Sequence, residues 1–186
     1  MKDCAGQYYH VYNRGTNHQS IFAKDENYNF LLHRVKQFIP LYAVRVIAYS
    51  LMPNHYHFIV GVDQDGALGP FFQRLFNSYS QAFNRQQNRT GTLFEGRAKS
   101  KLIDESSHVY ALVRYIHLNP VVARMVTCPE NWQFSNYLEW IGVRNDELFD
   151  AQFRDSFFSS PEEYKQFVIS NIPEAMERKL TKYYFD

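Results

Sequence analysis

Two histidines separated by one residue are the feature of this chain with the clearest chemistry. His55 and His57 lie in the run MPNHYHFIV at positions 52–60, whose second half is rich in the aromatic and β-branched residues of strands. Side chains alternate between the two faces of a strand, so both imidazoles share one face. Two imidazoles on one face are half of a metal site, which still needs a further ligand and a reacting group.

The segment RYIHLNP at positions 114–120 offers both missing groups. Tyr115 and Asn119 are four residues apart and share one face of a helix, whereas His117 points roughly the opposite way. The amide oxygen of Asn119 can complete a metal site with His55 and His57 and still leave open positions for a substrate. Mixed nitrogen and oxygen ligands favour Mg²⁺ or Mn²⁺, and they also admit zinc.

A tyrosine beside such a metal indicates phosphodiester chemistry. A phenol is a poor nucleophile at neutral pH because its ordinary pKa is about 10. When it attacks a phosphodiester, however, the bond energy is kept in a phosphotyrosine, which the released 3′-OH can attack in turn. A metal would polarise the phosphate and offset the developing charge. Tyr115 is therefore the candidate catalytic residue.

The remaining pattern predicts the elements that hold these groups. Strands are expected near residues 8–15, 42–51 and 55–62, with amphipathic helices over 25–38 and 68–85. The short apolar pair Leu102 and Ile103 can close the sheet as a fourth strand. The order β-α-β-β-α-β predicts an α+β fold, the split βαβ arrangement of ferredoxin-like proteins, with an antiparallel sheet. A further helix carries Tyr115 and is expected to end at Asn119, because Pro120 disfavours helical geometry there.

Charge is unevenly distributed along the chain. Residues 1–125 hold 14 Lys and Arg against 8 Asp and Glu, a balance of +6, whereas residues 126–186 hold 6 against 11, a balance of −5. This asymmetry is compatible with a polyanion-binding half and an acidic appendage. We expect a domain over 1–126 and an accessory helical extension, packed on it, over 127–186. No apolar run reaches the roughly 18 residues of a membrane span, and no signal core or paired cysteine motif occurs, which predicts a cytoplasmic protein.

Four local patterns together resemble the HUH superfamily of single-strand DNA endonucleases, in particular the single-tyrosine HUH transposases of the IS200-like superfamily. They are YHVYNRG at 9–15, MPNHYH at 52–57, GTLFEGRAKS at 91–100 and YIHLNP at 115–120. Their order and spacing are similar to those of the branch associated with repetitive extragenic palindromes (REP). The middle residue of the His-hydrophobic-His motif is here Tyr56.

This resemblance implies a ferredoxin-like palm that carries His55 and His57, with Tyr115 as the nucleophile and Asn119 as the third metal ligand. It implies a transposase that cuts single-stranded DNA at or near a hairpin, leaving a 5′-phosphotyrosine and a free 3′-OH. The REP-associated branch favours a monomer with Tyr115 acting in cis, and a homodimer is the alternative. Residues expected to contact DNA phosphates or bases are Arg14, Asn54, Arg97, Lys99 and Lys101.

Two other functions are compatible with the same residues. The chain could be a regulator derived from a transposase, which binds hairpin DNA without cutting it. It could also be an unrelated metallohydrolase, in which the histidine strand activates water and Tyr115 only supports the site. A covalent adduct between protein and DNA that depends on Tyr115 separates the transposase from both.

Overall fold

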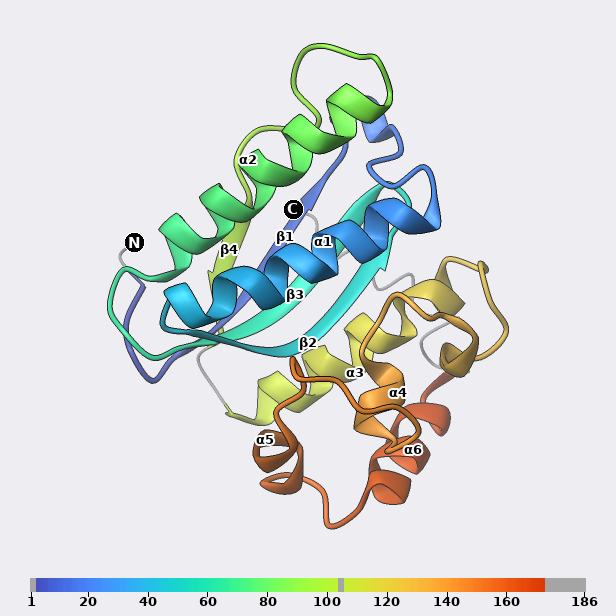
Figure 1. Cartoon of the computed structure of the whole chain (residues 1–186). Helices are drawn as coiled ribbons and strands as arrows, with labels where there is room; N and C mark the ends of the chain where they lie inside the picture. The colour runs from blue at the N-terminus through green and yellow to red at the C-terminus, as the bar shows by residue number, and fades with distance from the viewer. Residues whose placement is uncertain (1–2, 104–105, 173–186) are drawn as a thin grey trace.

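A computed structural model describes residues 3–103 and 106–172 of the chain (Figure 1). Its main elements are β1 (Tyr8–Arg14), α1 (Asp25–Phe38), β2 (Val44–Met52), β3 (His55–Val62), α2 (Leu68–Gln86), β4 (Lys99–Leu102) and α3 (Ser106–Val122). Three short helices follow: α4 (Tyr137–Trp140), α5 (Ala151–Asp155) and α6 (Pro161–Ile169). No helix within the described ranges is long and apolar enough to cross a membrane.

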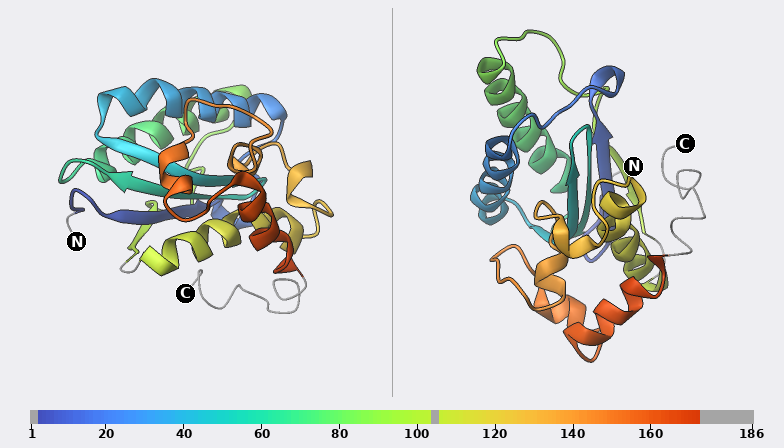
Figure 2. Two further views of the ribbon diagram at one scale, coloured as in Figure 1. Left: turned by 90° about the horizontal axis from the view of Figure 1, so that it is seen from below. Right: turned by 90° about the vertical axis from the view of Figure 1, so that its right-hand side faces the viewer.

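The four strands form one antiparallel sheet in the order β2-β3-β1-β4. Helices α1 and α2 cover one face of this sheet and α3 covers the other (Figure 2). This is the β-α-β-β-α-β arrangement expected from the sequence, so the predicted α+β fold is confirmed.

The alternation of side chains along β3 divides the core into two layers. Tyr56 and Phe58 point towards α2, where the fully buried ring of Tyr56 stacks on Phe76 with ring centroids 4.2 Å apart. His55 and His57 point to the opposite face, where α3 lies. Strand β3 therefore has aromatic residues in the packed core on one face and the candidate site histidines on the other.

The fourth strand begins earlier than its apolar residues suggest. It covers Lys99–Leu102 rather than the pair Leu102 and Ile103. Lys99 and Lys101 face the histidine side of the sheet, because they pair with Tyr12 and His10 of β1. A charged edge strand is common, since charge keeps an open sheet edge from pairing with other chains. The apolar pattern was therefore a poor guide to this strand.

The sequence prediction that α3 ends at Asn119 is wrong, because the helix continues through Pro120 to Val122. Proline inside a helix removes one backbone hydrogen bond and costs about 3 kcal/mol. Here the last turn is buried by packing at Val121, and Ala123 N–H still donates to Asn119 O at 2.9 Å. The continuation keeps Asn119 in helical register with Tyr115.

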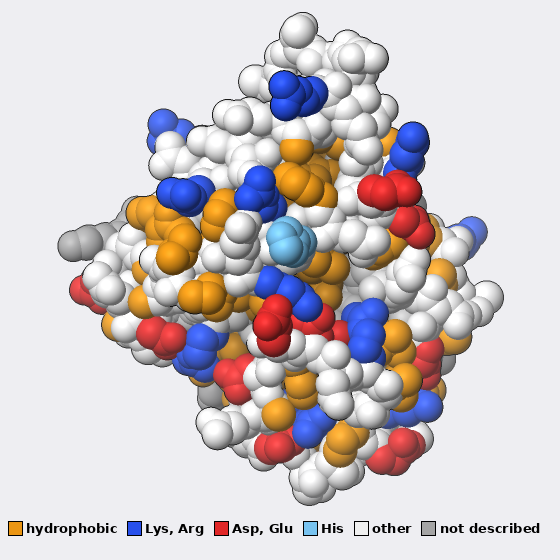
Figure 3. All heavy atoms as spheres, in the orientation of Figure 1, with side chains coloured by type: hydrophobic (Ala, Val, Ile, Leu, Met, Phe, Trp, Pro, Cys, Tyr) orange, Lys and Arg blue, Asp and Glu red, His pale blue; other side chains and the backbone are white. Residues whose placement is uncertain are grey.

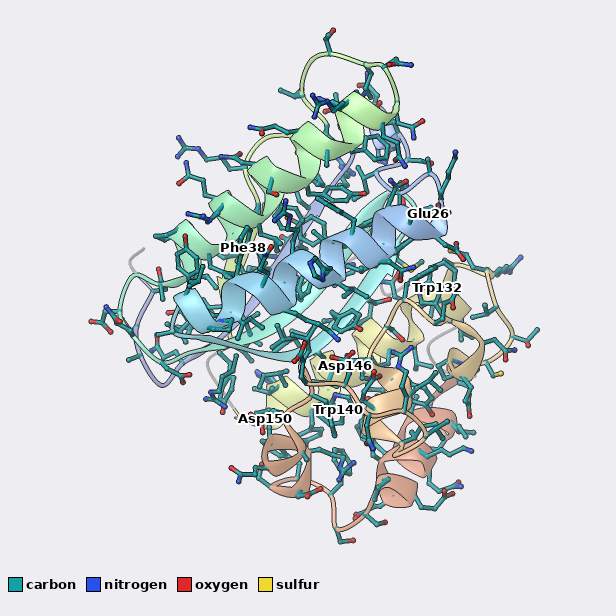
Figure 4. All side chains as sticks on the ribbon, in the orientation of Figure 1. Glu26, Phe38, Trp132, Trp140, Asp146 and Asp150 are labelled. Atoms are coloured by element: carbon teal, nitrogen blue, oxygen red, sulfur yellow. The ribbon has the colours of Figure 1, made fainter. Side chains whose placement is uncertain are left out.

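The segment after α3 packs along the β2 edge and over the outer surface of α3. The indole N–H groups of Trp132 and Trp140 donate to the carbonyls of Leu51 and Ile47, each at 3.1 Å (Figure 4). The short α4, α5 and α6 bury apolar side chains against α3 in a second core. Residues 127–172 therefore hold the helix that carries Tyr115 against the sheet.

Part of the acidic charge of this segment neutralises basic residues of the palm. Lys36 of α1 pairs with Asp146 at 2.7 Å, and Arg45 of β2 pairs with Asp150 at 2.8 Å. On the face drawn in Figure 3, acidic side chains are concentrated over the lower part, whereas Lys and Arg predominate over α2. Exposed ion pairs contribute little to stability, but these two bring acidic side chains of the C-terminal segment against basic side chains of α1 and β2.

Asn136 is the main polar link between the C-terminal segment and β2. Its Oδ1 accepts from Tyr49 N–H at 2.8 Å and lies 2.9 Å from Nε2 of His117, and its Nδ2 donates to Ile47 O at 3.0 Å. We expect Asn136→Ala to lower the free energy of unfolding by about 2 to 4 kcal/mol, because buried polar groups lose their partners. Urea unfolding at pH 7 checks this, with the exposed Asn131→Ala as control. A loss below about 1 kcal/mol would contradict this role.

Candidate active site

The two strand histidines lie where β3 begins, next to β1 and β2. His55 pairs with Arg14 and Met52 across the sheet, and His57 pairs with Tyr12 and Ser50. His55 is half-buried and His57 is fully buried. Their ring centroids are 5.2 Å apart with an interplanar angle of 81°, so the two imidazoles share a face but approach α3 from different directions.

Helix α3 brings Tyr115 and Asn119 to this pair. Nε2 of His55 lies 3.3 Å from Oδ1 of Asn119, and Nδ2 of Asn119 donates to the Tyr115 hydroxyl at 3.3 Å. The Tyr115 ring packs edge-on against His57, with centroids 5.9 Å apart. The four side chains chosen from the sequence as nucleophile and metal ligands therefore form one cluster, with Asn119 between His55 and Tyr115.

Asn54, in the turn before β3, fixes the orientation of His55. Nδ1 of His55 lies 2.7 Å from Oδ1 of Asn54. A carboxamide oxygen only accepts hydrogen bonds, so this shorter contact favours a proton on Nδ1, which leaves a lone pair on Nε2. From the sequence, Asn54 was expected to contact DNA bases. Within the protein, its Oδ1 contacts the neighbouring histidine, and its contact with DNA stays a prediction.

His57 has a partner that the sequence prediction missed. Its Nδ1 lies 2.9 Å from Nε2 of His10 on β1, and both residues are buried. The other ring nitrogen of His57, Nε2, is also buried. Because Nδ1 is engaged by His10, Nε2 is the nitrogen of His57 that could bind a metal.

These residues fit a divalent cation. With the ring proton on Nδ1, the lone pair on Nε2 of His55 faces Oδ1 of Asn119 at 3.3 Å, and a cation between these two atoms would bind both. That separation is close to the roughly 3 Å between neighbouring ligands of a six-coordinate divalent ion. Among residues 3–103 and 106–172 no cluster of three His, Cys, Asp or Glu that could hold a metal occurs, and the amide oxygen of Asn119 is the candidate third ligand beside His55.

The surroundings of His55 and His57 keep both imidazoles neutral. Burial lowers the pKa of His55 to about 4, although the nearby Asn119 side chain opposes this shift. Burial, with the nearby His10 and His55, lowers the pKa of His57 well below its ordinary value. Both rings are therefore neutral at pH 7, which metal binding requires.

His117, on the helix that carries Tyr115, has a structural role. His117 lies on the side of α3 away from His55, as the helical spacing predicted, and is fully buried. Its Nδ1 lies 2.6 Å from the Tyr164 hydroxyl of α6, and its Nε2 donates to Oδ1 of Asn136 at 2.9 Å. A neutral imidazole satisfies both contacts, and burial lowers the pKa of His117 to about 4.

This buried histidine predicts sensitivity of the fold to acid. The pKa of His117 is near 6.5 in the unfolded chain and about 4 in the folded protein, so the unfolded state takes up the proton first. Neutral His117 therefore contributes fully to the free energy of unfolding above about pH 6.5. This contribution, roughly 3 kcal/mol, is lost as the pH falls towards 4. Urea unfolding between pH 7 and pH 4.5 measures the loss. His117→Gln should reduce the slope of the profile, leaving the part due to the other buried histidines, whereas His108→Gln, at an exposed position on the same helix, should not; equal slopes in the two variants would contradict this.

Two of the predicted DNA-binding residues lie beside the cluster. The Nζ atoms of Lys99 and Lys101 are each 5.9 Å from the ring centroid of Tyr12, and Tyr12 pairs with His57 in the sheet. They place positive charge on the histidine face, next to β1. Such charge suits a phosphate backbone that approaches from the β4 edge.

The other basic candidates differ in their surroundings. Arg97 is exposed in the loop before β4. Arg14, at the end of β1, forms an ion pair with Glu95, so its charge is already compensated. Because Arg14 and Glu95 are 81 residues apart in the sequence, sequence reasoning could not foresee this pair.

Comparison with known families assigns the chain to a family. The family model described as "Transposase IS200 like" matches residues 4–119, which is more than half of the chain. The chain therefore belongs to the IS200-like transposase family, as its motifs predicted. The matched residues run from before β1 to Asn119 and include all four clustered side chains. Comparison with curated proteins gives no match.

Several solved structures resemble this one. A REP-associated tyrosine transposase bound to a REP hairpin aligns with a TM-score of 0.61 and 16% identity, over 81% of this chain and 94% of that chain. A putative transposase from Deinococcus radiodurans R1 gives 0.44 and 15%, over 60% and 93%. The tRNA(His) guanylyltransferase from Saccharomyces cerevisiae gives 0.46 and 11%, over 92% and 81%. The first likeness shows a shared fold.

Proposed function

We propose that this transposase is a divalent-metal-dependent endonuclease and strand transferase that acts on single-stranded DNA next to a hairpin. The observation that carries the proposal is the meeting of a strand and a helix at one cluster. His55 and His57 come from β3, Tyr115 and Asn119 come from α3, and Asn119 lies within 3.3 Å of both His55 and Tyr115.

Tyr115 is the proposed nucleophile. Its phenol oxygen attacks the phosphorus of the DNA backbone, the bond from phosphorus to the 3′ oxygen breaks, and the 5′ phosphate becomes joined to the tyrosine. The phenol loses its proton to water, and the leaving strand takes up a proton to become a 3′-OH. A second 3′-OH reverses the step by attacking the phosphotyrosine, which joins strands without an external energy source.

Asn119 has two roles in this proposal. Its Oδ1 faces His55 on the metal side of the cluster, and its Nδ2 donates to the Tyr115 oxygen. A donor at that oxygen favours the phenolate over the phenol, because it stabilises the charged form. The same amide therefore places the nucleophile beside the metal-binding group and activates it.

The residues that would hold the metal are His55, through Nε2, His57, through Nε2, and Asn119, through Oδ1. When bound, a divalent ion supplies Lewis-acid polarisation of the scissile phosphate. Lys99 and Lys101 bind neighbouring phosphates and orient the strand, and Arg97 extends this basic edge. Arg14 is already paired with Glu95.

Hairpin DNA is the proposed substrate. The family assignment supports a DNA substrate, and the solved relative of the same fold was bound to a REP hairpin. The cluster is assembled within one chain, because α3 packs against the sheet that carries His55 and His57. We therefore propose that a monomer cuts in cis, which light scattering of the active protein can test.

Metal removal tests the proposal. Hairpin-bearing single-stranded DNA is incubated with the protein and Mn²⁺ or Mg²⁺, with excess EDTA as control. We expect cleavage with either ion, its loss in EDTA, and its return when Mn²⁺ is added in excess. DNA binding without cleavage on every hairpin substrate would favour the regulator instead. Cleavage without a protein-linked intermediate would favour a metallohydrolase.

A further inference from the structure

We propose that His10 is a positioning residue for His57, a role that rests on the proposed function of His57 as a metal ligand. Nε2 of His10 accepts a hydrogen bond from Nδ1–H of His57 and so holds the lone pair of His57 on Nε2, the metal-binding side. His10 belongs to the YHVYNRG motif of β1, to which the proposed function gives no other task.

The contact between the two imidazoles is short and enclosed. Nε2 of His10 lies 2.9 Å from Nδ1 of His57, and the two residues are 1% and 0% exposed. The rings are inclined by only 19°. On the other side of His10, the Tyr12 ring stacks on it with centroids 4.8 Å apart. The orientation of His10 is therefore fixed by packing before any metal binds.

The position of one proton decides whether His57 can bind a metal. A neutral imidazole carries a single N–H. If His57 carries it on Nδ1 and donates to His10, its Nε2 has a free lone pair. If His10 donates instead, His57 must carry its proton on Nε2, and that nitrogen cannot bind a cation. Metal binding therefore selects the arrangement in which His57 donates and His10 keeps its own proton on Nδ1.

Metal-bound histidines generally donate their second N–H to a carboxylate, a backbone carbonyl or water. A neutral imidazole in this place orients His57 without adding negative charge beside a site that receives a phosphodiester.

Two substitutions separate hydrogen bonding from packing. His10→Gln keeps a carbonyl acceptor near the position of Nε2, whereas His10→Leu fills the space without an acceptor; Tyr12→Phe keeps the stacked ring and serves as control. We expect His10→Leu to weaken Mn²⁺ binding by about 10- to 100-fold, as loss of such outer partners does elsewhere. His10→Gln and Tyr12→Phe should stay within about threefold of the parent, and saturating Mn²⁺ should restore cleavage in His10→Leu. Unchanged Mn²⁺ affinity in His10→Leu would overturn the proposal.

Long-range proton–nitrogen NMR of the metal-free protein provides a test that needs no activity. We expect His57 to carry its proton on Nδ1 in the parent protein and in His10→Gln, and a proton on Nε2 would overturn the proposal. This measurement decides the question even if His10→Leu does not fold. If the parent protein binds no Mn²⁺, the proposed metal function fails, whereas the NMR result still reports whether His10 fixes the tautomer.

Discussion

Replacing Tyr115 with phenylalanine should abolish covalent attachment of the protein to hairpin-bearing DNA and lower cleavage by at least about a thousandfold. Removing a covalent nucleophile commonly has an effect of that size, because no neighbouring group can form the same intermediate. Phenylalanine keeps the ring that packs against His57, so the site should retain its shape. The lost hydrogen bond with Asn119 should cost about 1 kcal/mol of stability.

The matched control is Tyr110→Phe. Tyr110 lies on the same helix but packs against Phe157 and Phe167 of the C-terminal segment. Single-turnover cleavage with excess protein, resolved on denaturing gels, gives both the rate and the protein-linked fraction. Tyr110→Phe should cleave like the parent protein. A Tyr115→Phe protein that still formed an adduct would show that another residue is the nucleophile.

Replacing His55 with alanine should have the second-largest effect, a loss of Mn²⁺-dependent cleavage of about 100-fold or more. The substitution removes one of three proposed ligands and leaves Oδ1 of Asn119 without its partner. Metal-assisted phosphate chemistry depends on that ligand set for both affinity and orientation. DNA binding should persist, because the basic residues of the β4 edge are untouched.

His33→Gln is the control for this experiment, because His33 is exposed on α1, beyond the opposite face of the sheet. Mn²⁺ affinity is measured by calorimetry and, independently, from cleavage over a series of Mn²⁺ concentrations. Both measurements should rank the variants in the same order of affinity. If His55→Ala cleaved like His33→Gln at every Mn²⁺ concentration, His55 would not be a ligand and the proposed role of the strand would be wrong.

Periodicity accounts for the part of the site that could be predicted from sequence. A period of two places His55 and His57 on one face, and a spacing of four places Tyr115 and Asn119 on another. The histidine face of β3 meets the Tyr115 face of α3 because of the ferredoxin-like order of elements, in which α3 follows β4 and covers the open face of the sheet. The spacing along the sequence was sufficient to predict these pairs, because both residues of each pair lie within one helix or strand.

The rest of the site depends on register and packing. His10 meets His57 only because β1 and β3 pair with Tyr12 opposite His57, and no local pattern sets that register. The pairing of Arg14 with Glu95 likewise joins residues from distant parts of the sequence. The continuation of α3 past Pro120 reflects burial by the C-terminal segment, which outweighs the local preference of proline. These features follow from contacts between elements rather than from the residues of one element.

The most direct test of the account is to identify the amino acid that becomes linked to DNA. The parent protein is allowed to react with Mn²⁺ and a hairpin substrate, the complex is digested with trypsin and nuclease, and the modified peptide is sequenced by mass spectrometry. We predict a nucleotide joined through its 5′ phosphate to Tyr115, together with a released strand that ends in a 3′-OH. Linkage to any other residue, or a 3′-phosphate link, would contradict the proposed mechanism.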